Sequence, residues 1–282
     1  MILTHLKIQF IDILKEEYPA EEIESFFHLL TENYLGMRRL DVALKPGFEL
    51  SRDQVNLFEQ ALEKLKNHVP IQYITEKTEF YGLPFKVTPA VLIPRPETEE
   101  LVEWIISDHE NVKKQIRILD IGTGSGCIAI SLKKNLTNTI IKAIDISEEA
   151  LKLAKENAGL NELQVDFRKE DILQKENFSE QYDIIASNPP YVREEEKKDM
   201  KPNVLDHEPK QALYVEDKNP LLFYKKITKL ANKWLAPGGF LYFEINQYLG
   251  RQTQEMVENH GFKTELKKDI FDNDRMLKAW KN

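Results

Sequence analysis

Cysteine is almost absent from this sequence: the 282 residues include only one, Cys127. An internal disulfide is therefore excluded. The six histidines are scattered along the chain, and no second cysteine accompanies them, so no metal-ligand spacing is present. We therefore expect no metal ion in the functional site.

Long apolar runs are missing too. No stretch approaches the roughly 18 apolar residues that a membrane span needs, and the amino terminus has no basic patch before an apolar segment. Hydrophobic residues make up 41% of the chain and charged residues 30%, which is typical of a globular protein with a sizeable core. We expect a cytoplasmic protein with no membrane partner.

The chain has no excess of basic residues. It carries 39 Lys and Arg against 47 Asp and Glu, a net charge of −8, and acids outnumber bases both in residues 1–75 and in the remainder. Nucleic-acid affinity rests largely on Lys and Arg side chains that neutralise phosphates. We therefore expect no direct nucleic-acid partner, although a local basic patch would still be compatible with this balance.

The spacing of apolar residues divides the chain into three parts. Residues 3–68 repeat them at helical spacing, as in Ile23, Phe26, Phe27 and Leu30, and Ser51–Gln54 has the pattern of a capping box. We predict a helical bundle over residues 1–75. A hairpin linker over residues 76–96, turning near residues 82–84, and a larger domain over residues 97–282 follow. Short strands are predicted at 71–74, 79–81 and 85–87.

A glycine-rich loop lies between a predicted strand and a predicted helix. The short apolar strand predicted over Arg117–Ile121 precedes Gly122–Gly126, and a helix is predicted to begin at Cys127. Glycines let the backbone turn tightly and let a ligand approach closely, while the helix amino terminus presents free N–H groups. In this setting the loop predicts a site for a nucleotide-like ligand.

Two acids follow at predicted strand ends. Asp145 ends the strand 140–145, about 20 residues beyond the glycines, where such folds bind ribose hydroxyls. Asp171 lies near the same edge and could accept a hydrogen bond from an adenine amine. Taken singly, Asp145 could be a helix-entry acid beside Ser147, and Asp171 a solvated loop acid; their shared position at strand ends favours the ligand role.

The glycine spacing discriminates between adenosine-containing ligands. The loop reads G-x-G-x-G, whereas the dinucleotide fingerprint is G-x-G-x-x-G. Asp120, just before the loop, would repel a pyrophosphate but attract an α-amino group. S-adenosylmethionine therefore fits better than a dinucleotide. The candidate cofactor residues are Asp120, Gly122, Thr123, Gly124, Ser125, Gly126, Asp145, Asp171, Ile172 and Asn188.

The segment Ser187–Tyr191 ends the apolar run 182–186 and should lie at the carboxyl end of a buried strand. Two prolines remove two backbone donors, so the turn offers carbonyl acceptors, to which the Asn188 side chain adds another. With the aromatic face of Tyr191, this turn suits a planar group that carries an NH2. The candidate catalytic and substrate-binding residues are Asn188, Pro189, Pro190 and Tyr191.

The last third continues the same pattern. A helix is predicted from Asn219 to Leu235, then a turn and a strand over residues 240–244. The charged segment 192–219 is predicted to be an irregular loop; directly after the turn, it could cover a substrate.

The glycine loop, Asp145 and Asn188–Tyr191 together resemble the class I methyltransferases that modify planar nitrogens. Ile93–Glu99, and His207–Pro209 with Ala212–Leu213, are similar to segments of the bacterial HemK/PrmC family, the release factor glutamine methyltransferases. The resemblance implies an α/β fold: a seven-stranded, Rossmann-like, S-adenosylmethionine-dependent methyltransferase domain after a small helical bundle. It also implies that the last strand, 275–280, is antiparallel.

The resemblance further implies an activity. It places Gly122–Gly126, Asp145 and Ile172 on S-adenosyl-L-methionine, and Asn188–Tyr191 on the side-chain amide of the Gln in the Gly-Gly-Gln loop of class 1 peptide chain release factors. The expected enzyme is a protein-glutamine N-methyltransferase of translation termination, expected to be a monomer, whose residues 1–75 dock the substrate. The alternatives are an exocyclic-amine methyltransferase acting on adenine or cytosine, and a catalytically idle scaffold.

Overall fold

The structure is a computed structural model that describes residues 1–177 and 180–281, apart from the side chain of residue 199. The chain forms two compact units. The first comprises Met1–Lys77 and Lys201–His207, and the second comprises Thr78–Met200 and the chain from Glu208 onwards. The boundary assigns most of the 76–96 hairpin to the second unit and adds a distant seven-residue segment to the first.

The first unit is helical. It contains α1 (Leu3–Leu14), α2 (Ala20–Leu35), α3 (Arg39–Leu44), α4 (Arg52–Lys66), α5 (Ile71–Thr75) and α9 (Pro202–His207). Its core includes Phe10, which packs edge-on against Phe27 and Phe58 with ring centroids 5.5 and 6.1 Å apart. The predicted capping box is confirmed, because Ser51 Oγ accepts from Gln54 N and Gln54 Oε1 accepts from Ser51 N.

One predicted strand in this unit is wrong. Residues 71–74 belong to the helix α5, which follows Pro70. Ile71 and Ile74, three residues apart, both enter the core of the bundle, and the Thr75 hydroxyl donates to the Ile71 carbonyl. A run of four apolar residues fits a buried strand and a short buried helix equally well, so the sequence pattern alone could not separate them.

The second unit begins at Thr78 within the hairpin of β1 (Lys77–Phe80) and β2 (Leu83–Lys86). It also contains a seven-stranded sheet of order β10-β11-β9-β6-β3-β4-β5. Its strands are β3 (Ile116–Ile121), β4 (Thr139–Asp145), β5 (Asp166–Lys169), β6 (Tyr182–Ser187), β9 (Leu235–Glu244), β10 (Lys263–Lys268) and β11 (Asp274–Trp280). Strand β11 pairs antiparallel with β9 and with β10, while the other pairs are parallel. The prediction of an antiparallel last strand is confirmed.

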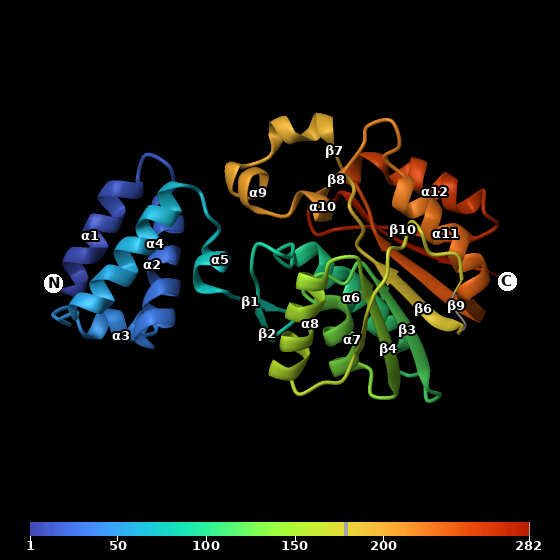
Figure 1. Ribbon diagram of the computed structural model, residues 1–282, viewed down its shortest axis with the longest axis horizontal. Coiled ribbons are helices and arrows are strands. Elements are labelled where there is room, and N and C mark those ends of the chain that lie inside the picture. The colour runs from blue at the N-terminus through green and yellow to red at the C-terminus, as the bar shows by residue number, and fades with distance from the viewer. Residues whose placement is uncertain (178–179, 282) are drawn as a thin grey trace. The chain divides into compact units, whose positions relative to one another are not determined.

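Helices cover both faces of this sheet (Figure 1). On one face lie α6 (Pro96–His109), α7 (Cys127–Asn135) and α8 (Glu148–Leu160); on the other lie α11 (Leu222–Trp234) and α12 (Gly250–Glu258), the latter preceded by the short turn η2 (Gln247–Leu249). Successive strand residues serve alternate faces: Ile118 packs in the first core and Leu119 in the second. Because both faces are buried, the central strands β3, β4 and β6 are mostly apolar and do not alternate strictly between apolar and polar residues. The predicted fold class is confirmed.

The segment 192–219 is more regular than predicted. It contains β7 (Val192–Arg193), the 3-10 turn η1 (Glu194–Asp199), α9, α10 (Lys210–Leu213) and β8 (Tyr214–Val215), and β7 pairs with β8 in parallel. Arg193 binds the carboxylates of Glu195 and Glu196, which fixes the start of η1. These helical turns are too short to show a periodic pattern of apolar residues. In a segment rich in charged residues, the sequence therefore carried no signal for them. No helix among the described residues is long and apolar enough to cross a membrane.

One buried side chain ties the hairpin and the glycine loop to α8. Asn157 is fully buried; its Oδ1 accepts from Lys86 N at 2.7 Å, and its Nδ2 donates to the carbonyls of Lys86 and Ser125 at 3.0 and 2.9 Å. An unpaired buried polar group is costly. The hairpin is thus held against the loop by one amide.

We therefore predict that Asn157→Ala lowers the free energy of unfolding by about 3 kcal/mol, because three backbone groups lose their partner. Urea denaturation followed by circular dichroism measures this. The control is Asn135→Ala at the exposed end of α7, which should change stability by less than about 0.5 kcal/mol. Equal effects of the two substitutions would contradict the role of Asn157.

Candidate active site

The glycine loop connects β3 to α7. Gly122, Gly124 and Gly126 have φ angles of 73°, 54° and 85°, a region in which glycine is favoured. A Cβ on Gly122 or Gly124 would meet no atom within 4 Å, whereas one on Gly126 would lie 3.0 Å from Ile130 Cδ1 and 3.2 Å from Ala154 Cβ. Gly126 therefore permits α7 to pack closely on α8, and the first two glycines face open space.

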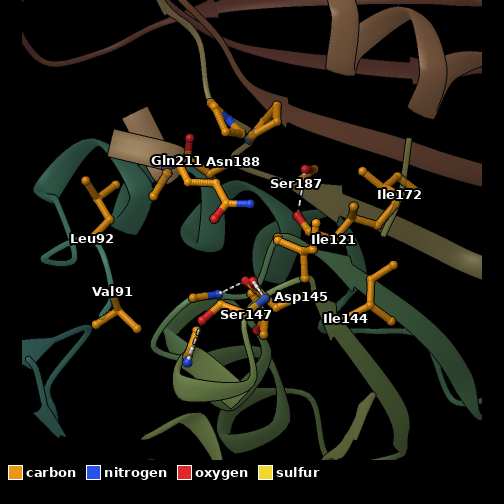
Figure 2. A pocket seen from close by; sticks show the side chains of 18 of the residues that line it. Val91, Leu92, Ile121, Ile144, Asp145, Ser147, Ile172, Ser187, Asn188 and Gln211 are labelled. Atoms are coloured by element: carbon orange, nitrogen blue, oxygen red, sulfur yellow. Dashed lines mark hydrogen bonds between the residues drawn. The ribbon is translucent and has the colours of Figure 1, made fainter. Parts of the chain in front are cut away.

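Asp145 ends β4 and holds this loop in place. Its Oδ2 accepts from Gly124 N, and its Oδ1 accepts from Ser147 N, both at 2.9 Å (Figure 2). Burial raises the pKa of Asp145, and these backbone hydrogen bonds oppose the rise. Each carboxylate oxygen has a second lone pair. Asp145 can therefore accept further hydrogen bonds from a ligand, in addition to capping the loop.

These elements open on a cavity of about 340 Å³ at the carboxyl ends of the parallel strands. Of the candidate cofactor and substrate residues, the cavity is lined by Gly122, Thr123, Gly124, Ser125, Asp145, Asp171, Ile172, Asn188, Pro189 and Pro190. Ile121, Ile144 and Ile172 form one apolar part of the wall (Figure 2). The segment before α6, the first turn of α6 and the chain around α10 complete the wall with Val91, Leu92, Arg95, Thr98, Pro209 and Gln211.

Asp171 lies on the wall as predicted, and its side chain also shapes the backbone. Its Oδ1 accepts from Leu173 N at 2.8 Å. This bond turns the chain just after β5. Ile172, the residue between Asp171 and Leu173, lines the cavity.

Asp120 is not among the residues that line the cavity. Its side chain is completely buried and accepts from the Thr123 hydroxyl at 2.6 Å. Burial, with a smaller contribution from the Asp145 charge, raises the pKa of Asp120 to about 7. Asp120 thus supports the glycine loop through Thr123, and its direct contact with a cofactor stays a prediction.

The turn after β6 presents acceptors to the cavity. Ser187 fastens the strand end to β3, because its hydroxyl donates to the Ile121 carbonyl at 2.7 Å. Asn188 Nδ2 donates to Thr98 Oγ1 at 3.2 Å. Within residues 1–177 and 180–281, the structure gives no hydrogen bond to Asn188 Oδ1 or to the Pro189 carbonyl oxygen. Both oxygens are free to accept from a ligand.

Tyr191 is not on the cavity wall. Its hydroxyl donates to Glu244 Oε1 at 3.0 Å, its N–H donates to the Leu213 carbonyl at 3.2 Å, and its own carbonyl accepts from Asn246 Nδ2 at 3.0 Å. Burial, together with the Glu244 charge, raises the pKa of Tyr191 well above its usual range. These three bonds hold Tyr191 against β9 and the chain that follows it, and its packing on a substrate amide stays a prediction.

Several residues of the site were missed by the sequence argument. Thr98 and Glu244 contact the turn from α6 and β9, and neither had been assigned a role. Arg95 lines the cavity and pairs with the buried Glu208, which also accepts from Ile93 N at 3.3 Å. One signal was available: Glu244 ends an apolar strand, as Asp145 does.

Comparison with known proteins agrees with this geometry. The family model "Methyltransferase small domain" matches residues 101–213, and "PrmC N-terminal domain" matches residues 6–75. A crystal structure of a methyltransferase from Pyrococcus furiosus has a TM-score of 0.55 and 20% identity, covering 79% of this chain and 98% of that one. The sheet order, the glycine loop and the family-model match over residues 101–213 define a class I methyltransferase domain.

Two curated relatives specify the family. A release factor glutamine methyltransferase of Flavobacterium psychrophilum is 52% identical over 282 residues, 99% of each chain. One of Bacteroides thetaiotaomicron is 46% identical over 268 residues, covering 94% of this chain and 95% of that one. This chain belongs to the release factor glutamine methyltransferase family, and the resemblance to HemK/PrmC is confirmed.

The buried carboxyl of Asp120 predicts a pH-dependent stability. Because its pKa in the folded protein lies near 7, above the ordinary value of 3.8, its stabilising contribution is complete below about pH 4 and is lost as the pH rises through 7. Asp120→Asn keeps an acceptor for Thr123 and does not titrate. Its Tm relative to the parent should therefore be higher at pH 8 than at pH 5 by about 2 °C or more.

Thermal unfolding at the two pH values measures this difference. Asp12→Asn, at an exposed position on α1, controls for the loss of one negative charge from the whole protein. A Tm difference between Asp120→Asn and the parent that is the same at pH 5 and pH 8 would contradict the shifted pKa.

Proposed function

We propose that this protein transfers the methyl group of S-adenosyl-L-methionine to the side-chain amide nitrogen of the Gln in the Gly-Gly-Gln loop of class 1 peptide chain release factors. The observation that carries the proposal is one shared cavity. The glycine loop, Asp145 and the turn Asn188–Pro190, which we call the acceptor turn, all line it. The names of the relatives indicate a release factor as the substrate.

The residues on the cavity wall fit the cofactor. Gly122 and Gly124 leave open space at the amino end of α7, where free N–H groups favour a carboxylate. Asp145 has lone pairs for ribose hydroxyls, Ile121 and Ile172 offer apolar surface for adenine, and Asp171 offers an acceptor for its amine. When bound, the cofactor supplies an electrophilic methyl group attached to sulfur.

The acceptor turn compensates for the low nucleophilicity of the substrate amide. An amide nitrogen is a poor nucleophile because its lone pair is delocalised into the carbonyl. Asn188 Oδ1 and the Pro189 carbonyl accept the two amide hydrogens, hold the nitrogen in place and stabilise the positive charge that develops on it. The amide nitrogen gains the methyl group as the methyl–sulfur bond breaks, and it then releases one of its hydrogens to solvent as a proton. Alignment of two bound reactants supplies several kcal/mol, up to about 7 to 11, so no strong base is required.

The direct experiment uses radiolabelled S-adenosylmethionine with a class 1 release factor and with its variant in which the loop Gln is replaced by Ala. We expect label on the parental factor and none on the variant. A DNA and an RNA oligonucleotide are included as further acceptors. Label on an oligonucleotide, with none on the factor, would replace the proposal with the exocyclic-amine alternative.

We predict that Asn188→Ala lowers kcat for release factor methylation by about 100-fold or more, because it removes one oriented acceptor from the reacting nitrogen. Single-turnover kinetics at saturating cofactor measures the rate. The matched control is Asp145→Ala, which should weaken cofactor binding by about tenfold or more in calorimetric titration and recover its rate at saturating cofactor. A parental single-turnover rate for Asn188→Ala would show that this side chain does not act on the amide.

Residues 1–75 act as the docking domain, residues 76–96 as the linker and residues 97–282 as the methyltransferase domain. The helical unit lines no part of the cavity described above, yet it has its own core. Binding energy from a remote surface of a folded substrate can align the reacting amide. A single Gln on a loop offers too little surface for this by itself.

We predict that a protein beginning at Thr78 still binds S-adenosylmethionine but loses kcat/KM on intact release factor by about 100-fold or more, because remote binding energy is no longer available for alignment. A short peptide of the methylated loop should be an almost equally poor substrate for both forms. Kinetics with both substrates, after cofactor titration of the truncated protein, tests this. An equal loss on peptide and factor would indicate a purely structural role for residues 1–75.

A further inference from the structure

A chain of hydrogen bonds runs behind the acceptor turn and joins three elements. Asn188 Nδ2 donates to Thr98 Oγ1 at 3.2 Å, and Thr98 Oγ1 donates to Glu244 Oε2 at 2.6 Å. Thr98 is 3% exposed and Glu244 1% exposed. Asn188 follows β6, Thr98 lies in the first turn of α6, and Glu244 is the last residue of β9. The chain therefore couples the turn to two rigid elements.

The direction of these bonds follows from the number of hydrogens available. A threonine hydroxyl has one hydrogen and two lone pairs. Because the Thr98 hydrogen is directed to Glu244, only a lone pair is left for Asn188. The side-chain amide of Asn188 must therefore turn its NH2 towards Thr98. Its oxygen is then directed away from Thr98, and Asn188 is one of the residues that line the cavity.

Glu244 fixes the direction at the other end of the chain. An ionised carboxylate is an acceptor only. Its Oε1 takes the hydroxyl hydrogen of Tyr191 at 3.0 Å, so both oxygens are occupied by donors. Burial raises the pKa of Glu244 and the nearby charge of Glu97 does so further, while the Thr98 and Tyr191 hydroxyls and the positive charge of Arg275 oppose the rise. Four groups from α6, the turn and β11 thus surround this carboxyl.

We propose that Thr98 and Glu244 are positioning residues that hold the Asn188 amide with its oxygen towards the substrate nitrogen. This inference rests on the proposed function, because only a substrate that carries an NH2 requires an acceptor there. A flipped Asn188 would present its own NH2 to the NH2 of the substrate. Two donors would then face each other, and the acceptor for one amide hydrogen would be lost.

The test compares Thr98→Val with Thr98→Ser. Val has nearly the shape of Thr but no hydroxyl, so the Asn188 amide loses its acceptor; Ser keeps the hydroxyl. We expect Thr98→Val to lower kcat on release factor by about tenfold or more, the value of one hydrogen bond, while the Kd for S-adenosylmethionine stays within about twofold. Thr98→Ser should restore kcat to within about threefold of the parent. Thr98→Ala also removes the hydroxyl and should lower kcat as Thr98→Val does. Because Ala is smaller than Thr, this variant cannot act by a steric clash.

A second measurement reports on the amide without activity. The side-chain 15N resonance of Asn188 is identified by its absence in Asn188→Ala. Its NH2 hydrogens should exchange slowly with solvent in the parent and in Thr98→Ser, and at least about tenfold faster in Thr98→Val, because the bond that protects them is gone. This readout separates orientation of the amide from general damage to the fold.

The outcomes distinguish the inference from the proposed function. If Asn188→Ala lowers kcat but Thr98→Val has the parental kcat and the parental amide exchange, the positioning role is wrong and the proposed function stands. If Asn188→Ala has no effect on methylation, the acceptor role in the proposed function is wrong. In that case, fast exchange confined to Thr98→Val would still support the hydrogen bond that orients the amide, and unchanged exchange would overturn it.

Discussion

The site depends on the parallel pairing of β6, β3 and β4. Because their carboxyl ends meet at one edge of the sheet, residues separated along the chain open on one cavity: Gly122 after β3, Asp145 at the end of β4 and Asn188 after β6. Side-chain bonds keep the strand ends in register, as where Ser187 donates to the Ile121 carbonyl and Asp145 accepts from Gly124 N. A change in this register would separate the cofactor loop from the acceptor turn.

The kind of ligand that the turn after β6 can bind depends on which of its polar groups already have hydrogen-bond partners in the protein. The donors near the turn are engaged by protein partners: Asn188 Nδ2 by Thr98, and the Thr98 and Tyr191 hydroxyls by Glu244. What the turn itself offers to the cavity is two oxygens, on the Asn188 side chain and the Pro189 carbonyl. A site of this kind favours a ligand that donates, and a primary amide donates two hydrogens from one nitrogen. Buried Glu244 is therefore as important to the arrangement of donors and acceptors at the site as the turn itself.

The sequence predicted the sheet, the glycine loop and the positions of Asp145 and Asn188, because each signal is local: an apolar strand followed directly by glycines, an acid or an acceptor turn. The sequence could not predict features that depend on contacts between residues far apart in the chain. Whether Asp120 faces a ligand depends on its burial beneath Thr123, and whether Tyr191 faces the cavity depends on Glu244, 53 residues away. The 71–74 segment became a helix because two of its residues enter the core of the bundle.

In the proposed reaction, one cavity brings the cofactor and a glutamine amide together. A crystal structure of the chain with S-adenosylhomocysteine and a release factor tests it most directly. We expect the glutamine Nε2 to lie about 3 Å from both Asn188 Oδ1 and the Pro189 carbonyl oxygen. The cofactor sulfur should lie on the opposite side of the transferred methyl position, and the cofactor ribose should contact Asp145. A glutamine amide bound outside this cavity, or one that accepts from Asn188 Nδ2, would contradict it.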